Sequence, residues 1–310
     1  MQTEIVHPQE LPLLLLPNSF LNNNDVKSFL SIPTNKLHHL NLPAARGKTI
    51  CGSSAGWLIV IDYVSTITLI NPLTSAHIQL PQISPNKVLI HKAILSSEPE
   101  CDPYNFVVMV IYGEKKQLAY YKARSESWEV LEAGCYYDDV ISEGRRKFYA
   151  LNEHGKVVKC KVNSLPAFKE VLEPWSFQGN KLYLFRIEGQ FFVVFRSLKD
   201  HQVSGYETYK FSVFKLNVKK ERYHMMGSFP SVALFLGQNQ STWLHADETK
   251  GVVGNSIYFT DDYASGCGGG GGHDFGRYNM EDDSVERFEC WDFQNLKCIE
   301  SRPIYLISNM

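Results

Sequence analysis

The sequence contains no Cys-x-x-Cys pair, and its seven cysteines, spread from Cys51 to Cys298, are an odd number. Structural zinc sites usually pair their ligands at a spacing of about two to four residues, and disulfide frameworks need an even set. These absences predict reduced thiols, no bound metal, no cofactor and a cytoplasmic or nuclear location. The alternative is a structural zinc held by Cys267, His273, Cys290 and Cys298.

The chain also lacks a strong charge of one sign, because its formal net charge is -2. Basic residues form only short runs beside acids, as in EGRRKF and NVKKER, whereas binding of nucleic acid usually needs a broad basic surface. The longest apolar run, LPLLLLP, is far shorter than the ~20 residues that span a bilayer. Glu4 and Glu10 stand where a signal peptide would be basic. The sequence therefore predicts no nucleic-acid partner, no membrane span and no secretory signal.

Sustained helical periodicity is missing too, which argues against an α/β fold. The best short helix candidate is NNNDVKSFL, residues 22–30, with Asp25 as a possible N-cap. Short strand patterns separated by turns dominate instead. Examples are Trp57–Ile61, Thr66–Ile70 and residues 77–80, with the Asn-Pro-Leu-Thr turn between the last two.

Groups of such strands recur about every 40 to 55 residues, which is the range of blade repeats in kelch-type propellers. Many strands are apolar on both faces, as WLIVI and FFVVF are, and stacked blades require this. We predict one all-β domain over residues 1–310, a kelch-like β-propeller of about six or seven blades. Pairing of residues 13–16 with residues 304–307 would close it and remove the open edge. A two-sheet sandwich is the alternative.

Residues 52–56, Gly-Ser-Ser-Ala-Gly, match the G-x-S-x-G nucleophile elbow. That elbow needs a strand before the serine and a helix after it. The strand pattern WLIVID follows here, so the motif is interpreted as a turn, and Ser54 is not expected to be a nucleophile. No other catalytic residue is assigned.

Residues 266–271 match the dinucleotide fingerprint G-x-G-x-x-G, but the next segment, HDFGRYNMEDDSVE, predicts a strand and an acidic turn rather than a helix. The glycine-rich stretch 265–274 is therefore expected to be a loop between two strands. Its flanks are expected to form an acidic, hydrogen-bonding rim where a partner binds. The residues of this predicted rim are Asp261, Asp262, Tyr263, His273 and Asp274.

Five segments in order, CGSSAGWLIVID, LINPLTSAHIQLP, ALFLGQNQS, NSIYFTDD and HDFGRYNMEDDSVE, resemble the KIB-type β-propeller domain of plant F-box proteins. The resemblance extends over roughly residues 10–290. In that family an F-box module binds Skp1, and the propeller is thought to hold a target for ubiquitination. No F-box pattern is recognised in this sequence. Either the chain is a propeller-only member, or an F-box lies ahead of it, and Skp1 is a partner only in the second case.

The sequence thus predicts a non-enzymatic protein-interaction scaffold that resembles the target-binding propeller of F-box substrate receptors in the ubiquitination pathway. The identity of the protein target is left open. The alternative is a hydrolase-type enzyme with a site at the propeller axis, where loops from several blades converge.

Overall fold

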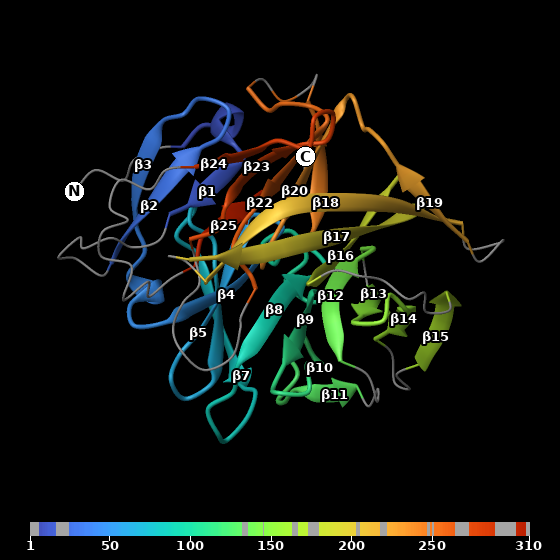
Figure 1. The fold of residues 1–310 in the computed structure, drawn as a ribbon. Coiled ribbons are helices and arrows are strands. Elements are labelled where there is room, and N and C mark those ends of the chain that lie inside the picture. Colours follow the sequence, from blue (N-terminus) through green and yellow to red (C-terminus); the bar gives the residue numbers. More distant parts are fainter. Residues whose placement is uncertain are drawn as a thin grey trace.

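The computed structural model describes residues 6–16, 25–131, 136–144, 146–162, 167–172, 180–202, 205–217, 222–246, 249, 251–263, 273–288 and 302–307. These residues form six β-sheets and no α-helix. The inner strands of successive sheets contact one another around a ring, as Figure 1 shows for β4, β8, β12 and β16. The bounds of the strands follow, sheet by sheet.

The first sheet has the order β25-β1-β2-β3 and consists of β25 (Ile304–Leu306), β1 (Leu13–Leu15), β2 (Val26–Ser31) and β3 (Leu37–Asn41). The second has β4 (Thr49–Ser54), β5 (Trp57–Ile61), β6 (Thr66–Ile70) and β7 (His77–Gln82). The third has β8 (Ile90–Leu95), β9 (Val107–Tyr112), β10 (Gln117–Lys122) and β11 (Glu129–Leu131).

The fourth sheet contains β12 (Tyr137–Ser142), β13 (Lys147–Asn152), β14 (Val157–Lys161) and β15 (Ala167–Leu172). The fifth contains β16 (Lys181–Ile187), β17 (Gln190–His201), β18 (Gly205–Asn217) and β19 (Arg222–Met226). The sixth has the order β21-β20-β22-β23-β24, from β20 (Val232–Leu236), β21 (Thr242–His245), β22 (Ser256–Phe259), β23 (Gly276–Asn279) and β24 (Val285–Arg287). Two short 3-10 helices are η1 (Pro8–Glu10) and η2 (Pro43–Ala45).

The ring is closed by the two ends of the chain, as the sequence predicted. β1 pairs antiparallel with β25, with Leu14 opposite Tyr305. The backbone N–H of Gly56 also donates to the carbonyl of Ile307 at 2.9 Å, which fastens this end to the second sheet. The first sheet therefore combines strands from both ends of the chain, which joins the last strand of the ring to the first.

Strands that are apolar on both faces are buried between neighbouring sheets. In β5, Trp57, Ile59 and Ile61 pack toward the third sheet, whereas Leu58 and Val60 pack toward the first. Each fully buried side chain of this size stabilises the fold by about 1.5–3 kcal/mol. The buried apolar side chains form six clusters, one between each pair of adjacent sheets in the described part of the chain. This stacking distinguishes the propeller from the two-sheet alternative.

Of the helix expected at residues 22–30, residues 22–24 lie outside the described part of the chain, and for the rest the prediction was wrong. Residues 26–31 form β2, whose side chains alternate between buried and half-buried positions. β2 pairs with β1 on one side and β3 on the other. The hydrogen bonds of a central strand outweigh a weak local helix preference. The side chain of Asp25 forms an ion pair with Arg46.

The sixth sheet departs from the regular pattern. Its strand β20 pairs parallel with β22, while β21 turns back along the other edge of β20. The connection between β20 and β21, residues 237–241, lies at the centre of the ring, where it contacts β4 and β8.

Candidate functional site

The structure brings the five residues of the predicted rim together at the end of the sixth sheet. Asp261, Asp262 and Tyr263 follow β22, and His273 and Asp274 precede β23, while loop residues 264–272 lie outside the described residues. The backbone N–H of His273 donates to Oδ2 of Asp261 at 3.1 Å. The ring Nδ1 of His273 lies 3.4 Å from the same oxygen.

The three carboxylates of this group point inward. Asp261 and Asp274 are each 1% exposed, and the side chain of Asp262 is 4% exposed. The carboxylates of the predicted acidic, hydrogen-bonding rim thus bond to groups inside the protein. Tyr263 and His273 are half-buried. Binding of a partner at these residues stays a prediction.

The centre of the cluster is Arg196 of β17, a completely buried residue that the sequence analysis missed. Its Nη2 donates to Oδ2 of Asp274 at 3.0 Å, and its Nη1 donates to Oδ1 of Asp262 at 3.2 Å. Nη1 also donates to the carbonyl of Thr260 at 2.8 Å, and Nε donates to Oγ1 of Thr208 at 2.7 Å. A charge buried so deeply is tolerated only when it is paired and hydrogen-bonded in this way.

A signal for Arg196 was present in the sequence. It is the only charged residue within the apolar run FFVVFRSL. Because arginine is almost never fully buried without a partner, a lone arginine in a core strand implies acidic residues nearby in the fold. Which acids supply that partner depends on the packing of the fifth sheet against the sixth, and this is not visible along the chain.

The charges in this cluster stabilise one another. Burial opposes ionisation of Asp262, but the charges of Lys181 and Arg196 outweigh it and hold the pKa of that carboxyl below its ordinary value. Tyr183 donates to the same carboxylate at 2.6 Å. Burial likewise opposes the charge of Lys181, yet Asp262 and Asp138 raise the pKa of that amine. The cluster is a structural tie between neighbouring sheets rather than a set of free reactive groups.

A second polar cluster fills the centre of the ring. Residues 237–241 lie among the first strands of three other sheets. The N–H of Gln240 donates to the carbonyl of Ser53 in β4 at 2.7 Å. The amine of Lys92, in β8, donates to the carbonyl of Gly237 at 3.1 Å. The segment thus occupies the position where the strands of the propeller converge.

Lys92 and Asp139 form an ion pair within this central cluster. Lys92 also donates to the Oγ of Ser241 at 3.3 Å, so its three N–H donors have three acceptors. The other carboxylate oxygen of Asp139 accepts from the Ser241 hydroxyl at 2.7 Å and from the Leu184 N–H at 2.8 Å. Every polar group of the pair is engaged.

The hydrogen bonds at the axis show how the hydroxyl groups of Ser54 and Ser241 are engaged. Ser54 is 5% exposed and donates to Oε1 of Gln240 at 2.8 Å, and none of the described residues places a histidine against its hydroxyl. The hydroxyl of Ser241 donates a hydrogen bond to Asp139, while the ammonium of Lys92 has no lone pair with which to accept one. The carboxylate beside Ser241 is itself held by Lys92 and by the N–H of Leu184, so both serines serve as members of this hydrogen-bond network.

The G-x-S-x-G motif is a hairpin turn between β4 and β5, as predicted, with Ala55 and Gly56 at φ of 52° and 77°. Gly52 has a separate role. A Cβ at this position would collide with the carbonyl oxygen of Ala93 in β8. The glycine is needed because two inner strands approach closely here.

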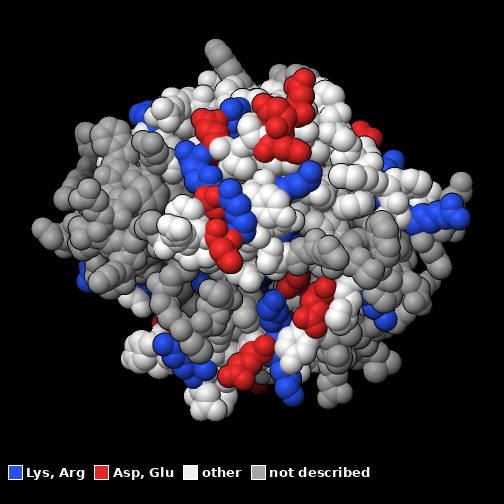
Figure 2. Space-filling model, viewed as in Figure 1, with Lys and Arg blue, Asp and Glu red and all other residues white. Residues whose placement is uncertain are grey.

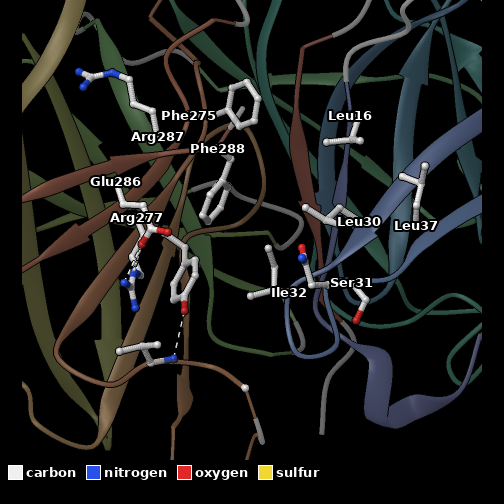
Figure 3. Close-up of a pocket in the computed structure, with 14 residues that line it drawn as sticks. Leu16, Leu30, Ser31, Ile32, Leu37, Phe275, Arg277, Glu286, Arg287 and Phe288 are labelled. Carbon is white, nitrogen blue, oxygen red and sulfur yellow. Dashed lines mark hydrogen bonds and ion pairs between the residues drawn. The ribbon is translucent and has the colours of Figure 1, made fainter. Parts of the chain in front are cut away.

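A cavity of about 710 Å³ lies between the first and sixth sheets. Figure 3 shows Phe275 and Phe288 on one wall and Leu16, Leu30 and Leu37 on the other. Its volume is in the usual range for ligand pockets, and its lining is mainly apolar. Leu16 and Phe288 are each the last described residue before a stretch outside the described part of the chain, residues 17–24 and 289–301.

The charged groups of the cavity wall are also paired. Nη2 of Arg277 donates to Oε2 of Glu286 at 2.6 Å, as the dashed line in Figure 3 marks. Arg287 donates to the carbonyl of Thr208 at 2.8 Å and lies 3.2 Å from Glu207. The cavity therefore offers apolar contact area without an uncompensated charge.

The described residues contain no group of three or more His, Cys, Asp or Glu side chains placed to hold a metal ion. Of the residues in the zinc alternative, Cys267, Cys290 and Cys298 lie outside that part of the chain.

Among the described residues, no helix is long and apolar enough to cross a membrane. On the face in Figure 2, basic and acidic side chains lie next to one another without a broad area of one sign. The absence of a nucleic-acid partner stays a prediction.

Six stacked sheets, closed by strands from both chain ends and with an occupied axis, define a six-bladed β-propeller. Residues 29–279 match the model of the KIB1-4 β-propeller family. The chain belongs to this family.

Among curated proteins, the chain is similar to one from Arabidopsis thaliana that carries the name of an F-box protein. The two are 25% identical over 250 residues, which cover 76% of this chain and 69% of that protein. Among solved structures it is similar to a protein of unknown function from Bacteroides caccae, with 14% identity, 69% and 73% of the two chains covered, and a TM-score of 0.38. It is also similar to an auxiliary nutrient binding protein from Bacteroides thetaiotaomicron, with 11% identity and a TM-score of 0.40. The match covers 61% of this chain and 55% of that protein.

Proposed function

We propose that this chain is a non-enzymatic protein-interaction scaffold, the target-binding propeller of a substrate receptor of the F-box kind in the ubiquitination pathway. The observation that carries the proposal is the match of residues 29–279 to the KIB1-4 β-propeller family, with a relative that bears an F-box name. A rigid ring of sheets that displays loops at its edges suits this role, because binding residues are concentrated on loops held by a stable scaffold.

The polar clusters support the same function. Lys92, Asp139 and Ser241 at the axis bond to one another, and Arg196 is paired with Asp262 and Asp274. A hydrolase would need an accessible nucleophile with a base beside it. Labelling with a serine-reactive fluorophosphonate probe checks this point: we expect the wild type to label no more than Ser54→Ala.

Skp1 is a partner only if an F-box module is joined to this propeller. We place its action in the cytoplasm or nucleus, which suits the free thiols of Cys51, Cys101 and Cys160.

Affinity purification tests the proposal. The tagged chain is expressed in plant cells, and proteins that co-purify with it, but not with an identically tagged fluorescent protein, are identified by mass spectrometry. A specific protein target is expected. Recovery of Skp1 along with the target supports a complete receptor, and recovery of the target alone supports a scaffold without the ligase link. Repeated failure to recover any specific protein would overturn the proposal.

A further inference from the structure

Arg302, which lies two positions before β25, is half-buried, and among the described residues it makes no hydrogen bond and no ion pair. An arginine that is partly removed from water normally has an acceptor, because its five N–H donors otherwise lose hydrogen bonds. Arg186, for example, has a side chain that is 27% exposed and pairs with Glu143. The charge of Arg302 differs, since no carboxylate in the described part of the chain neutralises it.

The charge of Arg302 acts on His91, a half-buried residue at the start of β8. Burial lowers the pKa of this ring, and its hydrogen bond to the carbonyl of Gly113 raises it. Lys116, Lys181 and Arg302 lower this pKa further, so the three charged groups that shift it are all cations. A place that repels a proton attracts an anion, because both respond to the same positive potential.

Hydrogen bonds hold these groups together at one end of the propeller axis. Lys181, the first residue of β16, donates to the carbonyl of Asp138 at 2.9 Å. Lys116, in the turn between β9 and β10, donates to Oδ1 of the same aspartate at 2.8 Å. The ring of His91 donates to the carbonyl of Gly113 in that turn at 2.9 Å. The side chains of Lys116 and Lys181 are 31% and 12% exposed, so solvent reaches this end of the axis.

The acidic side chains near this end of the axis already face other cations. They are Asp138, Asp139, Asp262 and Asp261, which face Lys116, Lys92, Arg196 and His273, respectively. Lys181 lies 4.0 Å from Asp262 and shares that carboxylate. Glu114 and Lys115, exposed in the turn between β9 and β10, carry opposite charges and balance each other. Among the described residues, the positive charge left without a carboxylate here is that of Arg302.

We propose that Arg302 binds a carboxylate of the bound protein, an Asp or Glu side chain, at this end of the propeller axis. A planar guanidinium donates two parallel hydrogen bonds to a carboxylate, and the neighbouring lysines add to the attraction. One unneutralised positive charge complements one carboxylate, whereas a phosphate group carries about −1.5 to −2 charges at pH 7. This inference rests on the proposed function, and it specifies which end of the propeller the target contacts and by which chemistry.

The first test needs no partner and measures the pKa of His91 by NMR titration of the full chain with labelled histidine. Arg302→Gln should raise this pKa, because one of the three cations that oppose protonation is removed. The matched control is Arg124→Gln, at an exposed arginine that lies over the ring of Tyr104, and it should leave the pKa of His91 unchanged. The same pKa in the wild type and in Arg302→Gln would overturn the site.

The second test measures, by calorimetry with the purified full chain, the affinity for the protein identified in the purification above. Arg302→Glu is expected to weaken binding by about tenfold or more, since two like charges then face each other. The loss should be larger at low salt. Arg302→Lys keeps the charge and should retain more of the affinity than Arg302→Gln does. Arg124→Glu controls for the change in net charge and should change binding by less than about twofold.

Cross-linking tests the chemistry of the partner without relying on a loss of binding. A carbodiimide joins an amine to a carboxylate held next to it, so the Arg302→Lys variant should become linked to an Asp or Glu of the partner through position 302. Mass spectrometry identifies the linked residue, and Arg124→Lys is the control that should give no such link. Treatment of the partner with phosphatase should leave its affinity unchanged, and a loss of affinity would overturn the carboxylate in favour of a phosphate.

The outcomes separate the two proposals. If the wild-type chain binds its partner and Arg302→Glu binds it equally well, or if position 302 gives no cross-link, the inferred site is wrong and the proposed function stands. Absence of any specific partner for the wild type overturns the function itself.

Discussion

Lys92 of β8 and Asp139 of β12 form an ion pair at the centre of the propeller, with side chains that are 3% and 0% exposed. Neither charge reaches solvent, so each depends on the other. Lys92→Met leaves the carboxylate without its cation and should cost about 3–5 kcal/mol of unfolding free energy. Urea titration measures this loss.

The double variant Lys92→Met/Asp139→Asn removes both charges while keeping an acceptor for Ser241 or Leu184. It should be more stable than Lys92→Met alone, because the uncompensated buried charge is gone. Equal stability of the single and double variants would show that the pair does not act as a unit.

Arg196 is predicted to be among the least replaceable side chains. Arg196→Met removes the cation that faces Asp262 and Asp274, and should also cost about 3–5 kcal/mol. Arg124, an exposed arginine whose guanidinium lies 3.9 Å from the centre of the Tyr104 ring, provides the control. Arg124→Met should cost about 1 kcal/mol or less. Comparable losses from the two substitutions in urea would contradict a structural role for the buried cluster.

Acidification should reveal the contribution of Asp262. Its pKa is lower in the folded protein than its ordinary 3.8. The contribution of ionised Asp262 to the unfolding free energy is therefore fully present above pH 3.8. It is lost as the pH falls through the pKa that this carboxyl has in the folded protein. The difference in unfolding free energy between wild type and Asp262→Asn should shrink as the pH is lowered from about 6 to below about 3.8. A difference that stays constant over this range would argue against the ion pairs assigned to this carboxylate.

Gly52 and Gly227 should respond differently to the same substitution. At Gly52 an added methyl group meets the backbone of Ala93, whereas at Gly227 no atom lies within 4 Å. Gly52→Ala should lower stability by about 1–3 kcal/mol or more, because two inner strands must separate. Gly227→Ala should leave the thermal midpoint nearly unchanged. The contact between β4 and β8 would be looser than described if both variants melted with the wild type.

Removal of residues 301–310 deletes β25 and exposes the edge of β1. We expect cooperative thermal unfolding to be lost, since the first sheet then no longer closes the ring. Deletion of residues 308–310 alone keeps β25 and provides the control. A truncated chain that unfolds with the midpoint and sharpness of the full chain would exclude closure as the stabilising feature.

Local patterns predicted much of this fold. Trp57–Ile61 and Thr66–Ile70 have the bounds that the sequence predicted, because apolar runs between turn residues are a strong strand signal. Closure by the chain ends was also predicted correctly, and the six observed sheets agree with the predicted six or seven blades. Residues 26–30 show the limit: they were part of a short helical pattern but form strand β2, since pairing with β1 and β3 determines the conformation there.

The sequence by itself determined the repeat of apolar strands. Sheets built from such strands must stack to remove their apolar faces from water, and this requirement defines the propeller class. Only the tertiary structure decided which charges meet. Asp262 and Asp274 were predicted to form part of an acidic rim, but their partner Arg196, which lies 66 and 78 positions before them, was not predicted. Lys92 and Ser241 are separated by 149 positions and meet at the axis. Such contacts form only when six sheets close into a ring and bring distant residues together. The same closure buries the charges, and burial strengthens their electrostatic interaction.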